Sequence, residues 1–329
     1  FMQNILVTGG AGYIGSHICL KLRESGYCPV VFDNLSNGHR DAIAPDIPFI
    51  QADIRDSEKL DRTFSEFQPT AVIHMAALIE AGLSMQEPSK FYNVNVAGSL
   101  NLLDAMRRHD CLHIVFSSTA AVYGNVGLDL LDERLPVRPE NPYGRSKAMV
   151  ETMLADYFAI YGFKAIALRY FNAAGADPTG RAGERHDPET HLIPLALQAA
   201  AGLRSEMKIF GSDYDTPDGT CIRDYIHVDD LAEAHVKAVQ NLTSRKNTTF
   251  EIINIGTGKG YSVKEIIELC QSITGRNFPV SLEPRRPGDP AKLVADPAKA
   301  KVLLDWQPKY GSAHDIIKHS WNFYMKTMS

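Results

Sequence analysis

Short apolar runs alternate with longer amphipathic stretches along the first half of the chain. The apolar runs are rich in branched side chains and occupy positions 4–7, 29–32, 70–74, 111–117 and 164–169. Such runs are typical of strands buried on both faces of a sheet. The stretches between them are each long enough for a helix that covers one face, and they occupy residues 14–25, 57–67, 94–109 and 143–161. Because parallel neighbours need crossover connections, this alternation predicts an α/β fold with a doubly wound parallel sheet.

The pattern changes after Phe171. Residues 172–189 are rich in glycine, proline, aspartate and arginine, which is typical of a loop. A strand and a helix are predicted again at 224–228 and 229–241, and a further strand at 250–255, so we expect the chain to return to the sheet there.

Two domains are therefore expected to interleave in the sequence. The larger comprises residues 1–171 and 224–255, and a smaller α/β domain comprises residues 172–223 and 256–329. The smaller one contains two more helical patterns on either side of a proline-rich stretch, and these occupy residues 263–274 and 313–325.

Composition and charge narrow the possible classes of protein. The 329 residues are 44% hydrophobic and 22% charged, as in a globular chain with an ordinary core. The net charge is −5, so no overall positive field attracts nucleic acid or an anionic membrane surface. No apolar stretch approaches the about 18 residues of a membrane span, and we expect neither nucleic acid nor membrane as a partner. Five cysteines without a Cys-x-x-Cys pair indicate a reduced, cytoplasmic chain.

A glycine-rich segment directly follows the first apolar run and opens the first helical pattern. It places Gly9, Gly12 and Gly15 in the spacing Gly-x-x-Gly-x-x-Gly. Glycine permits a tight turn and the close approach of a pyrophosphate, and the third glycine lets the helix lie close to the strand. Unpaired backbone N–H groups and the positive end of the helix dipole then face the phosphates. The segment therefore predicts a dinucleotide-binding loop of the Rossmann type.

Two carboxylates follow this loop at the ends of the next predicted strands. Asp33 lies 18 residues after Gly15, close to the about 20 residues expected for the carboxylate that binds a ribose of the cofactor. A carboxylate accepts hydrogen bonds from both free ribose hydroxyls and repels a 2′-phosphate, so NAD is favoured over NADP. Asp53 follows the next strand, where it either reaches the adenine amino group or caps the following helix.

Two other patterns predict nothing further. The glycines and lysine at 256–260 fail the pattern of a nucleoside triphosphate loop, because Ile253 stands at its first glycine position and Gly260 follows the lysine. His186 and His191 lack a further ligand at metal spacing, and no His-Glu-x-x-His motif occurs. We therefore expect no metal.

The segment from Asn141 to Lys147 combines a helix start with a candidate acid–base pair. Asn141 suits the capping position, and Pro142 suits the first helical position. Tyr143 and Lys147 are four residues apart and share one helical face, where an ammonium is expected to lower the pKa of the phenol. Lys147 is also expected to bond the nicotinamide ribose. The alternative is an exposed helix pair without a catalytic role.

Hydroxyl and amide side chains add to this candidate site. Ser117 and Thr119 end the strand before the Tyr143 helix, at the carboxyl edge where doubly wound sheets bind ligands. Thr119 is expected to donate to a substrate hydroxyl or to relay its proton. For both side chains the alternative is a hydrogen bond to their own backbone. Asn95 is expected to support the catalytic region through a buried water.

Together these residues resemble the extended short-chain dehydrogenase/reductase family, and the resemblance spans nearly the whole chain. The glycine loop and Tyr-x-x-x-Lys are shared by many reductases of this family. Arg-Asp-Tyr-Ile-His-Val at 223–228 and Arg-Arg-Pro-Gly-Asp at 285–289 are more specific to its nucleotide-sugar epimerases and dehydratases. Further segments similar to its UDP-sugar 4-epimerases occur at 74–77, 123–124, 170–172 and 192–194.

The resemblance implies bound NAD as cofactor and a UDP-sugar as substrate. It extends the cofactor-binding set to Tyr13, Ile14, Asn34, Ile54, Ala76, Asn95, Ser117 and Tyr170. Arg223 and Arg286 are implied at the diphosphate, which suits their forked donors; without the resemblance, each is more simply a member of a surface ion pair. The remaining implied contacts are phosphate donors at Asn172 and the Leu192 backbone, Phe210 beside the uracil, and Asp289 at the uridine ribose.

The implied reaction is epimerisation at C4 of the sugar. Tyr143, directly or through Thr119, takes the proton of the 4-hydroxyl while C4 passes a hydride to NAD, and both return after the 4-keto sugar has turned its other face. The expected pair is UDP-glucose and UDP-galactose. Ala120 and Ala121 follow Thr119 and cannot supply the acid and base of a 4,6-dehydratase. The alternative from another class is a non-catalytic protein that binds NAD and UDP-sugar.

Two positions and two helical patterns carry further expectations from the resemblance. Ile79 stands where a bacterial branch of the epimerases has lysine near the nicotinamide. Leu293 stands where side-chain size correlates with the use of N-acetylated sugars, and its intermediate size leaves N-acetylhexosamine, pentose and uronate derivatives open. The helices at 94–109 and 143–161 resemble the pair that forms a dimer in this family, so a homodimer is expected.

Overall fold

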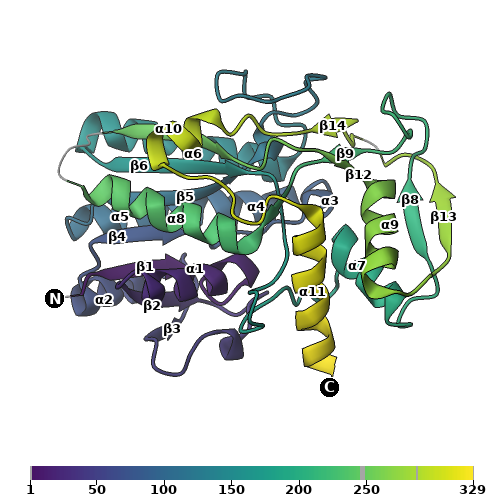
Figure 1. Cartoon of the computed structure of the whole chain (residues 1–329). Helices are drawn as coiled ribbons and strands as arrows, with labels where there is room; N and C mark the ends of the chain where they lie inside the picture. Colours follow the sequence, from purple (N-terminus) through teal and green to yellow (C-terminus); the bar gives the residue numbers. More distant parts are fainter. Residues whose placement is uncertain (1, 245–248, 287, 329) are drawn as a thin grey trace.

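A computed structural model describes residues 2–244, 249–286 and 288–328 (Figure 1). Pro287 of the Arg-Arg-Pro-Gly-Asp segment lies outside the described residues. Within them, seven parallel strands form one sheet in the order β11-β6-β5-β4-β1-β2-β3. In chain order these are β1 (Asn4–Thr8), β2 (Cys28–Asp33), β3 (Phe49–Gln51), β4 (Ala71–His74), β5 (His113–Thr119), β6 (Lys164–Tyr170) and β11 (Phe250–Ile255). The predicted doubly wound sheet is therefore confirmed.

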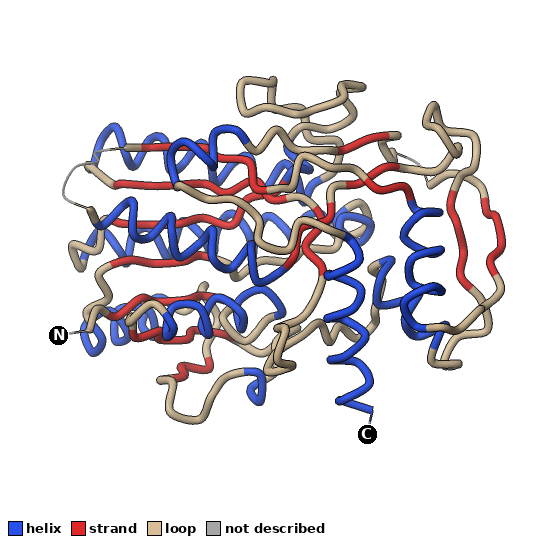
Figure 2. The backbone as a smooth tube through the Cα atoms, in the orientation of Figure 1, coloured by secondary structure: helices blue, strands red, loops and turns tan. Residues whose placement is uncertain are grey.

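Helices cover both faces of this sheet (Figures 1 and 2). One face packs on α1 (Tyr13–Glu24), α8 (Val228–Thr243) and α10 (Ala298–Leu304). The other face packs on α2 (Ser57–Phe67), α5 (Gly98–Arg108) and α6 (Pro142–Tyr161). Ile5 and Val7 of β1 enter the first core and Leu6 enters the second, because successive side chains of a strand point to opposite faces. Burial on both faces explains why these strands are continuous apolar runs.

Short helical segments line the carboxyl edge of the sheet or lead away from it. The stretch predicted as one helix at 94–109 begins as a π-helical turn, η2 (Tyr92–Ala97), that continues into α5. The other segments are η1 (Arg40–Ala42), α3 (Ala81–Ser84), α4 (Pro88–Phe91) and η3 (Ala120–Val122).

A smaller group of elements lies beyond the carboxyl ends of the sheet strands, at the right of Figure 1. Its core combines Ile193 of α7 (Leu192–Ala200), Ile266 of α9 (Val263–Thr274) and Ile316 of α11 (Ala313–Met328). In the described part of the chain, three small sheets accompany these helices. They are formed by β7 (Asn172–Ala174) with β10 (Tyr225–His227), by β9 (Ile222–Arg223) with β12 (Tyr261–Ser262) and β14 (Lys292–Leu293), and by β8 (Met207–Phe210) with β13 (Val280–Glu283). The predicted boundaries of the two interleaved domains stay a prediction.

The return of the chain to the main sheet differs from the expectation in one respect. The strand predicted at 224–228 is β10, and it pairs with β7 rather than with the seven-stranded sheet. β7 lies at the start of the stretch 172–189, which was expected to be loop throughout. The return is made instead by β11, which pairs with β6 along its whole length, and by α8, which packs on the sheet.

Across the described residues, no helix has both the length and the apolar character to cross a membrane.

Candidate active site

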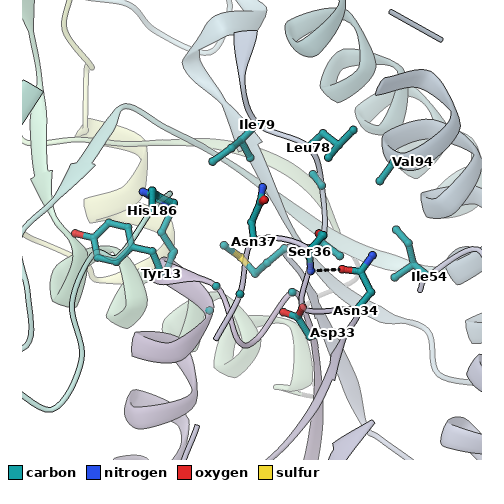
Figure 3. Close-up of a pocket in the computed structure, with 18 of the residues that line it drawn as sticks. Tyr13, Asp33, Asn34, Ser36, Asn37, Ile54, Leu78, Ile79, Val94 and His186 are labelled. Carbon is teal, nitrogen blue, oxygen red and sulfur yellow. Dashed lines mark hydrogen bonds between the residues drawn. The ribbon is translucent and has the colours of Figure 1, made fainter. Parts of the chain in front are cut away.

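A cavity of about 470 Å³ lies at the carboxyl edge of the main sheet (Figure 3). Tyr13 and His186 lie at one side of this view, and Ile54 and Val94 lie at the other. Most residues predicted to bind the dinucleotide line the cavity, together with Thr119 and Tyr143, predicted to act on the sugar, and Asn172, predicted at the phosphates. The predicted dinucleotide residues in this lining are Gly9, Gly12, Tyr13, Ile14, Gly15, Asp33, Asn34, Asp53, Ile54, Ala76, Tyr143 and Tyr170.

The glycine loop forms one wall of this cavity. Gly9 has a φ of +70°, which disfavours any side chain, and its N–H donates to Phe32 O at 2.9 Å. Helix α1 begins after Gly12 without a side-chain cap, so the N–H groups of its first turn have no side-chain acceptor. These donors face a cavity large enough for a ligand, and they form the kind of anion site that a pyrophosphate needs. The residues present therefore fit a dinucleotide.

Gly15 is expected to tolerate no larger residue. A Cβ at this position would lie 2.3 Å from Gly9 O and 2.7 Å from Gly10 Cα, and neither backbone atom can move without opening the loop. We expect Gly15→Ala to destabilise the protein by about 1 to 3 kcal/mol and to abolish retention of the dinucleotide. Urea unfolding and the absorbance ratio at 260 and 280 nm measure the two effects. Gly82→Ala is the control, because a Cβ there meets no atom within 4 Å, and an equally small effect in both variants would contradict the assignment.

Asp33 ends β2 at the floor of the cavity. Its two carboxylate oxygens accept the backbone N–H groups of Ala11 and Leu35, at 2.9 and 2.8 Å. Burial raises the pKa of Asp33, and these two hydrogen bonds oppose that rise. Each oxygen keeps a second lone pair for a ligand hydroxyl, so the geometry is compatible with the predicted ribose contact, which stays a prediction.

Asp53 lines the cavity and does not cap a helix. Its carboxylate pairs with Arg55 at 2.8 Å and accepts a hydrogen bond from Asn34 Nδ2 at 3.0 Å. The hydrogen bonds from Arg55 lower the pKa of Asp53 to about 2. The cap of α2 is Asp56, whose Oδ1 accepts the N–H of Lys59 at 3.0 Å, so the alternative role considered for Asp53 is wrong.

Tyr143 reaches the cavity from the first turn of α6. As predicted, Asn141 caps this helix, because its side-chain oxygen accepts the N–H of Gly144 at 2.8 Å, and Pro142 occupies the first turn. Burial raises the pKa of Tyr143, although a hydrogen bond with Thr119 partly opposes the rise. The predicted depression of this pKa by Lys147 is therefore wrong for the chain without ligands, because desolvation of the phenol outweighs the nearby donors.

Lys147 lies one turn further along α6, against β5. It is 3% exposed, its Nζ donates to Ser117 O at 2.9 Å, and Nζ lies 4.9 Å from the centre of the Phe116 ring. Burial lowers the pKa of Lys147 to about 7, and the nearby carboxylate of Glu151 opposes this effect. Lys147 is not an exposed member of a helix pair, which removes that alternative.

The polar side chains around this pair have specific partners. The Ser117 hydroxyl lies 2.7 Å from Nε2 of His235 and is fully buried. Thr119 accepts the backbone N–H of Ala121 at 3.1 Å and also bonds Tyr143. Its side chain therefore bonds the backbone and lies in the site at the same time. Asn95 bonds the Ser146 hydroxyl directly at 3.0 Å, without needing the expected water.

Of the residues implied for UDP, Asn172 lines this cavity, whereas Phe210, Arg223, Arg286, Asp289 and the Leu192 backbone form a second group outside its lining. Arg223 pairs with Asp289 at 3.2 Å, and Arg286 lies 4.0 Å from the centre of the Phe210 ring. Leu293 is the register partner of Arg223 in the small sheet and packs against a cluster that includes Phe171, a residue of the cavity wall. The backbone of Leu192 begins α7. Their roles toward a substrate stay predictions.

A group of residues on the cavity wall was not predicted from the sequence. Glu184, His186 and His191 line the cavity, and Glu189 lies beside them. The two histidines were expected to lack further ligands, which is wrong, because the fold brings both carboxylates against the rings. The signal was present in the sequence, where a glutamate precedes each histidine by two residues.

Comparisons with known proteins agree with this architecture. Residues 5–256 match the model of the NAD dependent epimerase/dehydratase family. The UDP-glucose 4-epimerase of Halalkalibacterium halodurans is 50% identical over 320 residues, which cover 97% of this chain and 95% of that protein. The structure of UDP-glucose 4-epimerase from Brucella ovis in complex with NAD has a TM-score of 0.94 at 48% identity, with 98% of each chain covered.

A further solved structure carries both kinds of ligand. UDP-glucose-4-epimerase from Stenotrophomonas maltophila, with bound NAD and formylated UDP-arabinopyranose, has a TM-score of 0.94 at 40% identity and covers 99% of this chain and 100% of its own. The match of the family model to most of the chain, together with full-length identity near one half, shows that this protein belongs to the NAD dependent epimerase/dehydratase family.

Proposed function

We propose that this protein is an NAD-dependent 4-epimerase that interconverts UDP-glucose and UDP-galactose. The observation that carries the proposal is one cavity in which a glycine loop fit for a dinucleotide faces the hydroxyls of Tyr143 and Thr119. Relatives that match the chain over nearly its full length are UDP-glucose 4-epimerases, which supports the choice of reaction.

The cofactor half of the cavity would hold NAD, which supplies a reversible hydride acceptor for C4 of the sugar. The N–H groups of the first turn of α1 would bind its pyrophosphate, and Asp33 would bind its ribose. Met75 and Ala76 lie against the glycine loop, where a Cβ at Gly9 would already be 2.7 Å from Ala76 N. This packing keeps the loop in the shape that its donors require.

Tyr143 is proposed to move the proton of the reaction. Its hydroxyl would take the proton of the sugar 4-hydroxyl, either directly or through Thr119, and return it to the opposite face of the 4-keto sugar. Lys147 is proposed as a positioning residue, because its ammonium is fixed on the Ser117 carbonyl one turn below the phenol. Burial of the whole group excludes water, which protects the ketone from side reactions.

Arg223, Arg286, Asn172 and the Leu192 backbone are proposed to hold UDP while the sugar turns. Arg223 is 12% exposed and is oriented by Asp289, so little ordering is needed before it meets a phosphate. Firm binding of UDP and weak binding of the sugar together allow both faces of C4 to be presented.

The direct test is conversion without added cofactor. Purified protein is mixed with UDP-galactose, and the appearance of UDP-glucose is followed by proton NMR; we expect the two sugars to reach equilibrium. A protein that binds NAD but converts neither sugar would be the non-catalytic alternative, and the proposal would fail.

We also propose that the size of the Leu293 side chain affects which other UDP-sugars the protein accepts. This side chain packs against a cluster that includes Phe171, a residue of the cavity wall, so a smaller residue would leave room for an acetamido group. We expect Leu293→Ser to raise kcat/KM for UDP-N-acetylglucosamine relative to UDP-glucose by about tenfold or more. Leu282→Ser is the matched control, because Leu282 is exposed on β13. An unchanged ratio would remove Leu293 from the specificity pocket.

A homodimer, a cytoplasmic location and a role in galactose metabolism are proposed as well. Leu100 on α5 and Met149 on α6 are 44% and 45% exposed, and such apolar positions on neighbouring helices suit a self-associating face. The five cysteines are unpaired, as in a reducing compartment. Light scattering after gel filtration tests the dimer, which would have twice the chain mass of 36.4 kDa.

A further inference from the structure

A compact group of histidine and glutamate side chains lies in the connection between β7 and α7. Glu184, His186, Glu189 and His191 each offer one ligand atom, and these four atoms lie within 4.8 Å of one another. Nothing in the proposed epimerase chemistry uses this group. Figure 3 shows His186 beside Tyr13 at the cavity, and the two rings are 6.0 Å apart.

The spacing of the four atoms suits a small tetrahedral cation. The Nδ1 atom of His186 lies 3.1 Å from Glu184 Oε1 and 3.7 Å from Glu189 Oε2, and that of His191 lies 3.0 and 2.9 Å from the same two carboxyl groups. Zinc binds histidine nitrogen and carboxylate oxygen at about 2.0 to 2.2 Å, so the edges of its tetrahedron are about 3.3 to 3.5 Å long. Small adjustments of these side chains would therefore surround one ion.

Charge and burial favour an ion at this position. The side chains of Glu184 and Glu189 are only 7% and 6% exposed, and two buried carboxylates side by side need compensation. The two arginines of the same connection pair elsewhere, Arg185 with Asp41 at 2.8 Å and Arg181 with Asp177 at 2.6 Å. Two carboxylates and two neutral imidazoles would balance a divalent cation, and imidazole is a preferred ligand of zinc.

The carboxylate of Glu189 is also held in place from behind. Its Oε1 accepts the backbone N–H groups of Thr190 and His191, at 2.7 and 2.8 Å. Hydrogen bonds of this kind orient a ligand and strengthen metal sites. The backbone of this loop therefore fixes the orientation of the Glu189 carboxylate.

We propose that Glu184, His186, Glu189 and His191 bind one Zn²⁺ ion. The site borders the same cavity but supplies no group to the proposed epimerase reaction, so the proposal does not depend on that function. Because its ligands come from one loop that leads into Leu192 at the start of α7, the ion would fix this part of the cavity wall. The rival is a cluster of ion pairs without metal, in which, despite burial, the hydrogen bonds to Glu184 and Glu189 raise the pKa of His186 to about 9.

The test measures metal binding by the full-length protein. Protein treated with chelator and desalted is incubated with ZnCl₂, passed through a second desalting column and assayed by elemental analysis; CoCl₂ is used in parallel for its visible spectrum. We expect about one Zn²⁺ per chain, the intense bands of four-coordinate Co²⁺, and a higher Tm with Zn²⁺, since a ligand of the folded state stabilises it.

Variants decide between the metal and the ion pairs. Glu189→Gln keeps an oxygen for the two backbone donors but removes the charge, and His186→Ala removes one ring; we expect each to weaken Zn²⁺ binding at least tenfold. His314→Ala, which changes a histidine that is 60% exposed on α11, should bind like the wild type. Equal zinc content in the wild type and Glu189→Gln, or a weak six-coordinate Co²⁺ spectrum, would overturn the proposal. Epimerase activity is not the readout, so failure here leaves the proposed function untouched.

Discussion

Replacing Tyr143 by phenylalanine is expected to lower kcat by about 100- to 10,000-fold, which is the range contributed by one general acid–base group. The variant keeps the ring that fills the cavity wall at the start of α6 and loses only the hydroxyl that bonds Thr119. Dinucleotide retention should stay at the wild-type level, because the glycine loop and Asp33 are unchanged. Initial rates with UDP-galactose and the nucleotide content of the purified variant measure the two quantities.

The control for this variant is Tyr161→Phe. Tyr161 ends the same helix and is 43% exposed, so the same chemical change there should leave kcat within about twofold of the wild type. If Tyr143→Phe turns over like Tyr161→Phe, another group moves the proton. If it also loses the dinucleotide, its loss of rate would not identify a catalytic hydroxyl.

Local patterns predicted the elements of the main sheet well. Each strand of β1, β2, β4, β5 and β6 is buried on both faces and appears in the sequence as an apolar run. The start of a helix was also predicted well where a side chain caps it, as Asn141 caps α6. Such signals reside in a few neighbouring residues, so one sequence is enough to find them.

The small sheets could not be predicted in this way. β7 and β10 have three residues each and pair across about 50 positions of sequence, so neither has a hydrophobic period long enough to identify. Their pairing depends on where α8 and the end of β6 already lie. The ion pair between Arg223 and Asp289 could not be predicted for the same reason, because the fold brings these two distant residues together.

The sequence predicted which residues form the site better than it predicted the pKa shifts of those residues. The glycine loop, Asp33 and Tyr143 were found from spacing, because their chemistry is tied to one strand end or one helical turn. The direction of the Tyr143 pKa was wrong, because burial is a property of the whole fold and outweighs a partner one turn away. The group of Glu184 and His186 was missed for a related reason, since its two Glu-x-His pairs lie in a stretch without helical or strand structure and are brought together only by the fold.

Burial of Lys147 leads to a prediction in which stability and activity change in opposite directions. Its pKa is lowered from 10.5 to about 7, mainly by burial, so the folded chain bears the cost of a desolvated charge. Below about pH 7 the amine is protonated in both the folded and the unfolded chain, and the cost is complete. Between about pH 7 and 10.5 only the unfolded chain keeps the proton, so the stability of the wild type rises with pH as this cost disappears.

We therefore expect Lys147→Met to be more stable than the wild type at pH 6 to 7, by roughly 3 kcal/mol after the lost hydrogen bond to Ser117 is subtracted. This advantage should shrink toward pH 10, while kcat falls at every pH because the amine that bonds Ser117 O and positions the site is gone. Urea unfolding of the dinucleotide-free proteins between pH 6 and 10 measures the difference. Lys264→Met, at an exposed position on α9, should show no such pH trend. A Lys147→Met variant that is less stable than the wild type at pH 6 would mean that the ammonium is compensated in the folded chain, and that its hydrogen bond and the field of Glu151 outweigh its desolvation.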